Sequence, residues 1–260
     1  MNRLEQRRIL VTGAGSGIGQ ATVLRLLSEG AAVVGADVNA EGLALTRKHA
    51  AEAGADTRLT TLEMNIGHEA EVIAGVKSAV ETLGGLDGLV NAAGILRAAH
   101  THETSLDLWN QIININLTGT FLVTREALPA LLANPSSNVV NFSSTSANFA
   151  HPYMAAYSAS KGGIQSFTHT LALEYGKRGL RAVSVAPGGI KSGITDATPG
   201  YLPQDSDWSF LGRLIAIVPQ DNPAELASPE NVAGVIAMLI SDDGRFISGT
   251  EIRIDGAAHT

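Results

Sequence analysis

The stretch Ile9-Leu10-Val11-Thr12-Gly13-Ala14-Gly15-Ser16-Gly17-Ile18-Gly19 decides the fold of this 260-residue chain. Its first four residues predict a strand, and the apolar pattern that begins near Ile18 predicts a helix. The glycines between them permit unusual backbone angles, and a helix N-terminus offers amide donors and a partial positive charge. The stretch is therefore typical of a turn that binds a dinucleotide's pyrophosphate; a turn that is merely tight is the alternative.

Strand and helix patterns alternate along the rest of the chain. The predicted strands cover Ile9–Thr12, Ala32–Asp37, Leu59–Met64, Leu89–Asn91, Asn138–Ser143, Ala182–Val185 and Ile252–Ile254. The predicted helices cover Ile18–Ser28, Glu41–Ala53, Glu69–Leu83, Ser105–Leu132, Ala155–Tyr175 and Pro229–Ile240. This order predicts an α/β Rossmann fold: one domain over residues 1–260, with a doubly wound parallel sheet of about seven strands and helices on both faces. Residues 193–227, rich in Pro, Asp and isolated aromatics, are predicted to form a loop that covers a site.

Composition excludes several classes of function. Hydrophobic residues make up 45% of the chain and charged residues 17%, which fits an α/β domain with buried strands. The net charge of -7 disfavours a nucleic-acid partner. The absence of cysteine excludes disulfides and thiolate zinc sites. No apolar segment is long enough for a signal peptide or a membrane span, so we expect a cytoplasmic protein without a membrane partner.

Asp37 ends the second predicted strand, eighteen residues beyond Gly19. A carboxylate at this place can accept hydrogen bonds from the adenosine ribose hydroxyls and would repel a 2′-phosphate. Ala36 and Val38 flank it, and Ser16 lies inside the turn, so no arginine is placed to neutralise a phosphate. These residues favour NAD as the cofactor over NADP; an aspartate that simply caps a loop is the alternative.

Tyr157 and Lys161 are four residues apart at the start of a predicted helix, so they project from the same face. A neighbouring ammonium and an oxidised nicotinamide would both favour the phenolate of a tyrosine whose pKa is ordinarily ~10. Alone, the spacing also fits a lysine that lies along a half-buried tyrosine. Ser144 strengthens the catalytic interpretation, because it ends a predicted strand thirteen residues before Tyr157, at the sheet edge where ligands bind.

These motifs together resemble the short-chain dehydrogenase/reductase family. Thr12 to Gly19 resembles its TGxxxGxG turn, Asn91 to Gly94 its NNAG segment, Tyr157 with Lys161 its active-site pair, and Pro187-Gly188 its PG turn. The resemblance implies that Asn116, Ser144, Tyr157 and Lys161 are catalytic. Asn116 is preferred over Asn114 because it immediately precedes Leu117 and a Thr-Gly-x-Phe stretch.

The resemblance also implies which residues contact the ligands. The expected cofactor contacts are Gly13, Gly15, Ser16, Gly17, Ile18, Gly19, Asp37, Asn65, Ile66, Asn91, Ala92, Ala93, Gly94, Tyr157, Lys161, Pro187, Gly188, Ile190 and Ser192. The expected substrate contacts are Ser144, Ser146, His151 and Tyr157. Three positions depart from the common pattern: Asn65-Ile66 replaces Asp-Val, Ala92 replaces an asparagine, and Ser192 replaces a threonine.

The implied reaction moves a hydride between NAD and the alcohol or carbonyl carbon of a small molecule. Ser144 and Tyr157 would hydrogen-bond the reacting oxygen, and Tyr157 would exchange the proton. Lys161 would bind the nicotinamide ribose and lower the pKa of Tyr157, while Asn116 would hold a water of a proton relay. The alternatives are a 3-oxoacyl thioester reductase of the same family and a non-catalytic NAD-binding module. The family's pairing surfaces imply a homodimer or homotetramer.

Histidines and aromatic residues elsewhere suggest fewer functions. His100 and His102 with Glu103 include possible metal ligands, but a polar loop without a further ligand cluster favours solvated surface. His151 lies between Ser144 and Tyr157, and either contacts a polar substrate group or is an ordinary loop histidine. The aromatic and apolar residues of the predicted loop, Trp208, Phe210 and Leu211, either close over an apolar substrate or pack the loop down.

Overall fold

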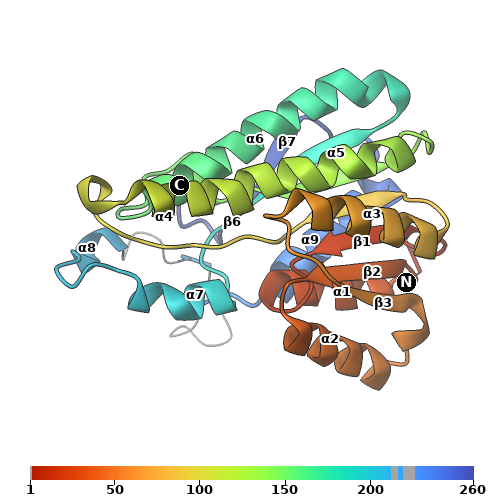
Figure 1. Ribbon diagram of the computed structural model, residues 1–260, viewed down its shortest axis with the longest axis horizontal. Coiled ribbons are helices and arrows are strands. Elements are labelled where there is room, and N and C mark those ends of the chain that lie inside the picture. Colours follow the sequence, from red (N-terminus) through yellow and green to blue (C-terminus); the bar gives the residue numbers. More distant parts are fainter. Residues whose placement is uncertain (1, 212–215, 219–225) are drawn as a thin grey trace.

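A computed structural model of the chain describes residues 2–211, 216–218 and 226–260. Seven strands form one sheet in the order β3-β2-β1-β4-β5-β6-β7, and every neighbouring pair is parallel (Figure 1). The strands are β1 (Arg8–Thr12), β2 (Ala32–Asp37), β3 (Leu59–Glu63), β4 (Gly88–Asn91), β5 (Asn138–Phe142), β6 (Arg181–Pro187) and β7 (Thr250–Ile254). The predicted doubly wound parallel sheet is confirmed.

Helices cover both faces of this sheet (Figure 1). They are α1 (Gly17–Ser28), α2 (Ala40–Glu52), α3 (Glu69–Leu83), α4 (Leu106–Ile113), α5 (Gly119–Leu131), α6 (Ala155–Tyr175), α7 (Gly193–Ala197), α8 (Trp208–Leu211) and α9 (Glu230–Ile240). Within the described residues, no helix combines the length and apolarity needed to cross a lipid bilayer.

Two hydrophobic cores follow from the alternation of side chains along the strands. Ile9 and Val11 of β1 belong to the core shared with α1, α2 and α9, whereas Leu10 belongs to the core shared with α3, α5 and α6. Successive side chains of a strand point to opposite faces, so a strand covered on both faces is apolar at nearly every position. The sheet can therefore contribute residues to a ligand site chiefly at the ends of its strands.

The predicted helix over Ser105–Leu132 is interrupted in the structure. Between α4 and α5, residues Asn114–Thr118 form a π-helical turn. Asn116 lies inside this turn and is fully buried. Single π-turns widen a helix by one residue, and they redirect side chains at functional sites. Periodicity alone predicts an unbroken helix here, because a shift of one residue hardly disturbs the apolar pattern.

The predicted loop over residues 193–227 contains two short helices in its described part, α7 and α8. Ser192 caps α7 by accepting a hydrogen bond from Thr195 N. Residues 212–215 and 219–225 of the predicted loop lie outside the described residues.

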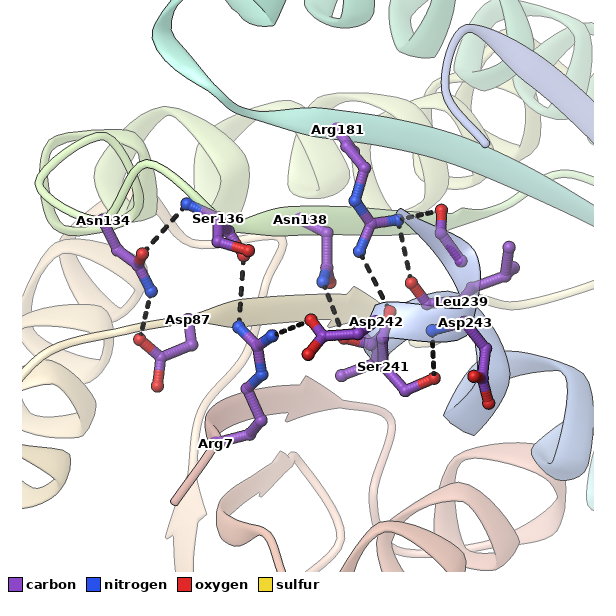
Figure 2. A network of polar contacts seen from close by, with 12 residues as sticks. Arg7, Asp87, Asn134, Ser136, Asn138, Arg181, Leu239, Ser241, Asp242 and Asp243 are labelled. Atoms are coloured by element: carbon purple, nitrogen blue, oxygen red, sulfur yellow. Dashed lines mark hydrogen bonds and ion pairs between the residues drawn. The ribbon is translucent and has the colours of Figure 1, made fainter. Parts of the chain in front are cut away.

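Polar side chains tie the N-terminal ends of the strands together (Figure 2). Arg7 Nη2 lies 2.6 Å from Asp242 Oδ1, and Arg7 Nη1 donates to the carbonyl oxygen of Ser136. Arg181 Nη1 donates to the carbonyl oxygen of Leu239 at 2.9 Å. These contacts link the residues just before β1 and β5, the start of β6 and the end of α9 at this edge of the sheet.

Asp87 is the most heavily bonded carboxylate at this edge. Its oxygens accept hydrogen bonds from the backbone N, Nε and Nη2 of Arg8 and from Asn134 Nδ2. Burial alone would raise the pKa of Asp87, but the hydrogen bonds from Arg8 and Asn134 outweigh it and lower the pKa.

We predict that Asp87→Ala lowers the free energy of unfolding by about 2–4 kcal/mol at pH 7, because buried donors lose a charged partner. Urea unfolding monitored by circular dichroism measures this loss. Since the folded-state pKa lies below its ordinary value of 3.8, the contribution is complete above pH 3.8 and is lost as the pH falls further. Asp243→Ala, which removes an exposed carboxylate from the same edge, is the control; equal losses in both variants would contradict the prediction.

Candidate active site

A cleft of about 450 Å³ crosses the C-terminal ends of the strands, where β1 and β4 lie side by side. The strand order reverses direction at this point, and open α/β sheets bind ligands there. The predicted cofactor contacts that line the cleft are Gly13, Ser16, Gly17, Ile18, Gly19, Asp37, Asn65, Ile66, Ala92, Ala93, Gly94, Tyr157, Lys161, Pro187, Gly188, Ile190 and Ser192. Ser144 lines the same cleft.

Glycines of the β1–α1 turn are required by close backbone approaches. A Cβ atom at Gly13, where φ is +73°, would lie 2.7 Å from Ala93 N, and one at Gly19 would lie 1.9 Å from Gly13 O. Ser16 is the N-cap of α1, and its side chain makes no capping hydrogen bond. The residues at the N-terminus of α1, Ser16 to Gly19, line a cleft whose volume suits a cofactor, so the turn fits a dinucleotide pyrophosphate.

Asp37 lines the cleft and also braces the turn. Its Oδ2 accepts a hydrogen bond from Gly15 N at 2.9 Å, and its Oδ1 accepts one from Asn39 N at 2.9 Å. Asp37 therefore caps the loop that follows β2, as the alternative interpretation of this aspartate predicts. A carboxylate can accept further hydrogen bonds, so these two leave capacity for ribose hydroxyls. Gly15, a predicted cofactor contact, does not line the cleft but holds Asp37 in place.

Asn91 does not line the cleft either. Its side chain is buried, and Nδ2 donates to Thr124 Oγ1 and Asn141 Oδ1. It therefore joins β4 to β5 and α5 rather than facing a ligand. Asn65 lies at the cleft, where its Oδ1 accepts a hydrogen bond from Gly67 N. The side chain of Asn65 thus shapes the turn after β3 and leaves its amide nitrogen available.

Three side chains with acid–base chemistry meet at the other end of the cleft. Ser144 follows β5, and Tyr157 and Lys161 lie in the first two turns of α6. The hydroxyl group of Ser144 lies near enough to that of Tyr157 to lower the pKa of Tyr157. Lys161 Nζ lies 5.6 Å from the centre of the Tyr157 ring and donates to the carbonyl oxygen of Phe142 at 2.8 Å. The predicted grouping is present.

Burial dominates the protonation of this group. It raises the pKa of Tyr157, and the hydrogen bond from Ser144 lowers that pKa by less. Burial also lowers the pKa of Lys161 to about 8. Removal of both groups from water disfavours their charged forms, and the lowering of the Tyr157 pKa by Lys161 beside a bound nicotinamide stays a prediction. The phenol is protonated at neutral pH and can donate a proton.

The side chain of Asn116 holds the backbone of Ile95, a residue that lines the cleft. Its Oδ1 accepts a hydrogen bond from Ile95 N at 2.8 Å, and its Nδ2 donates to Ile95 O at 2.9 Å and to Ser160 Oγ at 3.1 Å. A Cβ atom at Gly94 would lie 3.7 Å from Lys161 Nζ. The π-turn thus holds the Gly94–Ile95 segment beside Lys161, whereas a water bound by Asn116 stays a prediction.

Two predicted substrate contacts, Ser146 and His151, line a second hollow of about 590 Å³ that Phe210 also borders. His151 Nε2 lies 3.2 Å from Thr145 Oγ1, and burial, followed by the charge of His259, lowers its pKa to about 4. His151 is therefore neutral at pH 7. Ser146 Oγ is buried and has no partner among the described residues.

His259 is a neighbour of the site that the sequence did not indicate. Its Nδ1 lies 3.0 Å from Asp255 Oδ2, and its ring stacks on Phe149 at 4.5 Å and near-parallel to His151 at 5.6 Å. The end of the chain therefore packs against the segment before α6. An aspartate four residues before a histidine is the only local signal, and it is too common to single out.

His100, His102 and Glu103 lie together, as expected. His100 Nε2 is 2.9 Å from Asp205 Oδ1, which raises the pKa of His100. Within residues 2–211, 216–218 and 226–260, no group of three or more His, Asp or Glu side chains could hold a metal ion. Trp208 and Phe210 are 62% and 50% exposed, so α8 does not bury them against the described part of the chain.

Residues 7–200 match the family model of the short chain dehydrogenases. The chain belongs to this family. It is 34% identical to 2-(S)-hydroxypropyl-CoM dehydrogenase 3 of Xanthobacter autotrophicus, over 98% of this chain and 97% of the relative. It is also 34% identical to a 3-oxoacyl-[acyl-carrier-protein] reductase of Thermotoga maritima, over 98% of both chains.

Solved structures agree with the fold of this short-chain dehydrogenase. The crystal structure of levodione reductase superposes with a TM-score of 0.89 at 30% identity, and the match covers 97% of each chain. A short chain dehydrogenase from Burkholderia cenocepacia in complex with NADP superposes with a TM-score of 0.86 at 28% identity, over 100% of both chains. Relatives of this protein thus act on different alcohols or ketones, and one structural relative binds NADP.

Proposed function

We propose that this short-chain dehydrogenase transfers a hydride between NAD and the carbon of a secondary alcohol or ketone in a small organic molecule. The observation that supports this most directly is the grouping of Ser144, Tyr157 and Lys161 at one end of a cleft whose other end carries the glycine turn and Asp37. A bound nicotinamide would supply the hydride acceptor or donor at the end that holds Ser144, Tyr157 and Lys161. The chain's own residues supply the proton and the positioning.

Tyr157 exchanges a proton with the reacting oxygen in this proposal, and Ser144 holds that oxygen through a hydrogen bond. The raised pKa of Tyr157 suits proton donation during carbonyl reduction, and oxidation of the alcohol needs additional positive charge near the phenol. Lys161, bound to the Phe142 carbonyl, is placed to contribute that charge when it is protonated. Asn116 positions the backbone beside Lys161, and its role in a water relay is part of the proposal.

Preference for NAD rests on Asp37. A 2′-phosphate would meet its carboxylate, which the hydrogen bonds from Gly15 and Asn39 hold in place. Val38, the next residue, is 69% exposed and offers no positive charge to a phosphate. The Burkholderia relative is in complex with NADP, so the family's fold does not by itself select NAD, and the proposed preference rests on such local charges.

We predict that the wild-type enzyme favours NAD over NADP by about 100-fold in kcat/KM and that Asp37→Ser removes most of this preference. Steady-state kinetics with both cofactors measures it. Asp37→Asn is the matched control, because its side-chain oxygen can still accept from Gly15 N while the charge is lost. Equal use of NAD and NADP by the wild type would contradict the proposal, whereas equal losses with both cofactors in both variants would indicate damage to the turn.

A 3-oxoacyl thioester reductase is the second candidate, and the Thermotoga relative favours it. Reductive biosynthesis ordinarily draws on NADPH, which Asp37 would disfavour. The net charge of -7 also makes the chain a poor surface for an acidic carrier protein. Assays of NADH formation from secondary alcohols, diols, sugars, hydroxysteroids and 3-hydroxyacyl esters separate the two candidates. Turnover of none of them would support a non-catalytic NAD-binding module instead.

Three further features of the proposal concern the whole chain. Residues 1–260 act as one catalytic domain in which residues 193–227 form the substrate loop. The chain forms a homodimer or homotetramer, and it works in the cytoplasm. Analytical ultracentrifugation of the purified enzyme tests the oligomeric state; a monomer at micromolar concentration would contradict it.

A further inference from the structure

Two segments that border the cleft are fastened to each other. The first follows β4 and comprises residues 95–103; the second, which we call the cap segment, comprises residues 193–211 and contains α7 and α8. His100 Nε2 lies 2.9 Å from Asp205 Oδ1 of the cap segment, and Tyr153 Oη accepts a hydrogen bond from Asp207 N at 2.8 Å. Ala99 N donates to Tyr153 O at 2.9 Å. The cap segment is therefore held at a defined place beside residues 95–103.

Arg97 lies within this junction and faces the cap segment. Its guanidinium lies over the ring of Tyr201, 4.3 Å from the ring centre, and its Nη1 donates to Leu96 O at 2.7 Å. Stacking on an aromatic ring fixes the plane of a guanidinium and leaves its edge free for hydrogen bonds. Nε and Nη2 of Arg97 have no hydrogen-bond or ion-pair partner among the described residues.

The edge formed by Nε and Nη2 is the one that this protein uses elsewhere to bind carboxylates. Arg3 donates from Nε and Nη2 to the two oxygens of Glu29, both at 2.8 Å. Arg8 donates from the same two atoms to the two oxygens of Asp87, at 2.9 and 2.7 Å. Arg97 presents this bidentate edge while half-buried, with no described carboxylate to occupy it. Such a fork matches planar oxoanions.

Arg97 lies beside the cleft, two residues beyond Ile95 of its wall, and neither Arg97 nor Tyr201 lines the cleft itself. Gly94 and Ile95 line the cleft with Tyr157, and a Cβ atom at Gly94 would lie 3.7 Å from Lys161 Nζ. Arg97 follows Gly94 by three residues, a span of at most about 10 Å for its Cα atom. The stack on Tyr201 then directs its guanidinium toward the cap segment.

Nearby acidic groups do not neutralise Arg97. Asp205 is bound to His100, and Asp207 accepts a hydrogen bond from Ser209 N. Glu103 lies 3.8 Å from His102. These carboxylates would repel an anion that was merely nearby, so an anionic ligand here needs the direct hydrogen bonds that Arg97 offers.

We propose that Arg97 binds an anionic group of the substrate, a carboxylate or a sulfonate, through Nε and Nη2 while Tyr201 supports the guanidinium. This inference rests on the proposed function, and it assigns the substrate class: a small secondary hydroxy acid or its keto form. Arg97 is then a specificity-determining residue that sets which alcohol is placed against Ser144 and Tyr157.

Matched probes test the charge preference. The probes are 3-hydroxybutanoate, its methyl ester, 2-hydroxypropanesulfonate and 2-hydroxypropyltrimethylammonium, each assayed with NAD. We expect the wild type to favour an anionic probe over the ester and the ammonium by at least about 10-fold in kcat/KM. Arg97→Gln should abolish that ratio, mainly through KM, and Arg97→Lys should restore part of it, since lysine keeps the charge but not the fork. The two anions distinguish a carboxylate subsite from a sulfonate subsite.

Arg245→Gln is the matched control, because Arg245 is exposed and lies next to the Asp242–Gly244 turn, away from the cleft. This variant should keep the wild-type preference. A preference for the ester or ammonium in the wild type, or an unchanged anion preference in Arg97→Gln, would overturn the subsite.

A binding measurement separates this proposal from the proposed function. Isothermal titration calorimetry of each anion into Tyr157→Phe with NAD bound needs no turnover. Binding that Arg97→Gln weakens by about 10-fold or more supports the subsite even if no alcohol is oxidised. Equal affinity in the two backgrounds, or no binding of either anion at millimolar concentration, overturns it while turnover of neutral alcohols still supports the proposed function.

Discussion

Replacing Tyr157 by Phe should lower kcat by about 10³-fold while leaving the Kd for NADH within about threefold of the wild type. The variant removes one hydroxyl, the acid–base group that lies beside Ser144 at this end of the cleft. The ring stays in place, so the packing of α6 against β5 is retained. Stopped-flow and steady-state assays with the alcohol identified by screening measure the loss.

Ser144→Ala is the informative companion, because it removes the hydrogen bond that lowers the pKa of Tyr157 and leaves the phenol. Its alcohol oxidation should need a higher pH than that of the wild type, since the phenolate then has one stabilising contact fewer. An unimpaired kcat in Tyr157→Phe would exclude this tyrosine as the proton carrier. NADH titration by fluorescence shows whether either variant has instead lost its cofactor.

Replacing Lys161 by Met should abolish turnover and, at the same time, stabilise the protein without cofactor by about 2 kcal/mol at pH 7. Burial lowers the pKa of Lys161 from 10.5 to about 8, a shift worth about 3 kcal/mol of folding free energy at neutral pH. The lost hydrogen bond to the Phe142 carbonyl offsets about 1 kcal/mol of the gain. Urea unfolding of the two proteins without NAD measures the difference.

The pH dependence of this stabilisation has a defined sign. The folded-state pKa lies below the unfolded one, so the cost of burying the ammonium is complete below pH about 8. It decreases as the pH rises from about 8 toward 10.5, and it is lost above 10.5, where lysine becomes neutral in both states. The wild type should therefore approach the stability of Lys161→Met over that interval. A variant that is less stable than the wild type at pH 7 would show that Lys161 holds the fold together.

The order of strands and helices could be predicted from the sequence because each element depends on neighbours along the chain. The β1–α1 turn needs its glycines because the backbone approaches closely there: a Cβ atom at Gly19 would lie 1.9 Å from Gly13 O. The spacing of these glycines can be recognised directly in the sequence. Strands covered on both faces are apolar at nearly every position, which marks their place. Ser144, Tyr157 and Lys161 were found for a related reason, because they occur at the end of a predicted strand and at the start of a predicted helix.

Contacts between distant segments were decided by the tertiary structure. Asn116 turns inward because a π-helical turn lets its amide bond both backbone groups of Ile95, and no local pattern indicates that turn. Asn91 lies in a motif that suggests a ligand, yet its amide joins two strands and a helix. The raised pKa of Tyr157 follows from burial, which depends on how the elements pack together.

The sequence by itself predicted the fold, the glycine turn and the grouping of Ser144, Tyr157 and Lys161, because these depend on local periodicity, turn chemistry and fixed spacing. The tertiary structure decided which side-chain donors lack a partner among the described residues. Arg97 looks like any loop arginine in the sequence, and only its stacking on Tyr201, 104 positions later, leaves Nε and Nη2 free for an anion. Such contacts depend on packing between segments far apart in the chain, so local sequence patterns do not predict them.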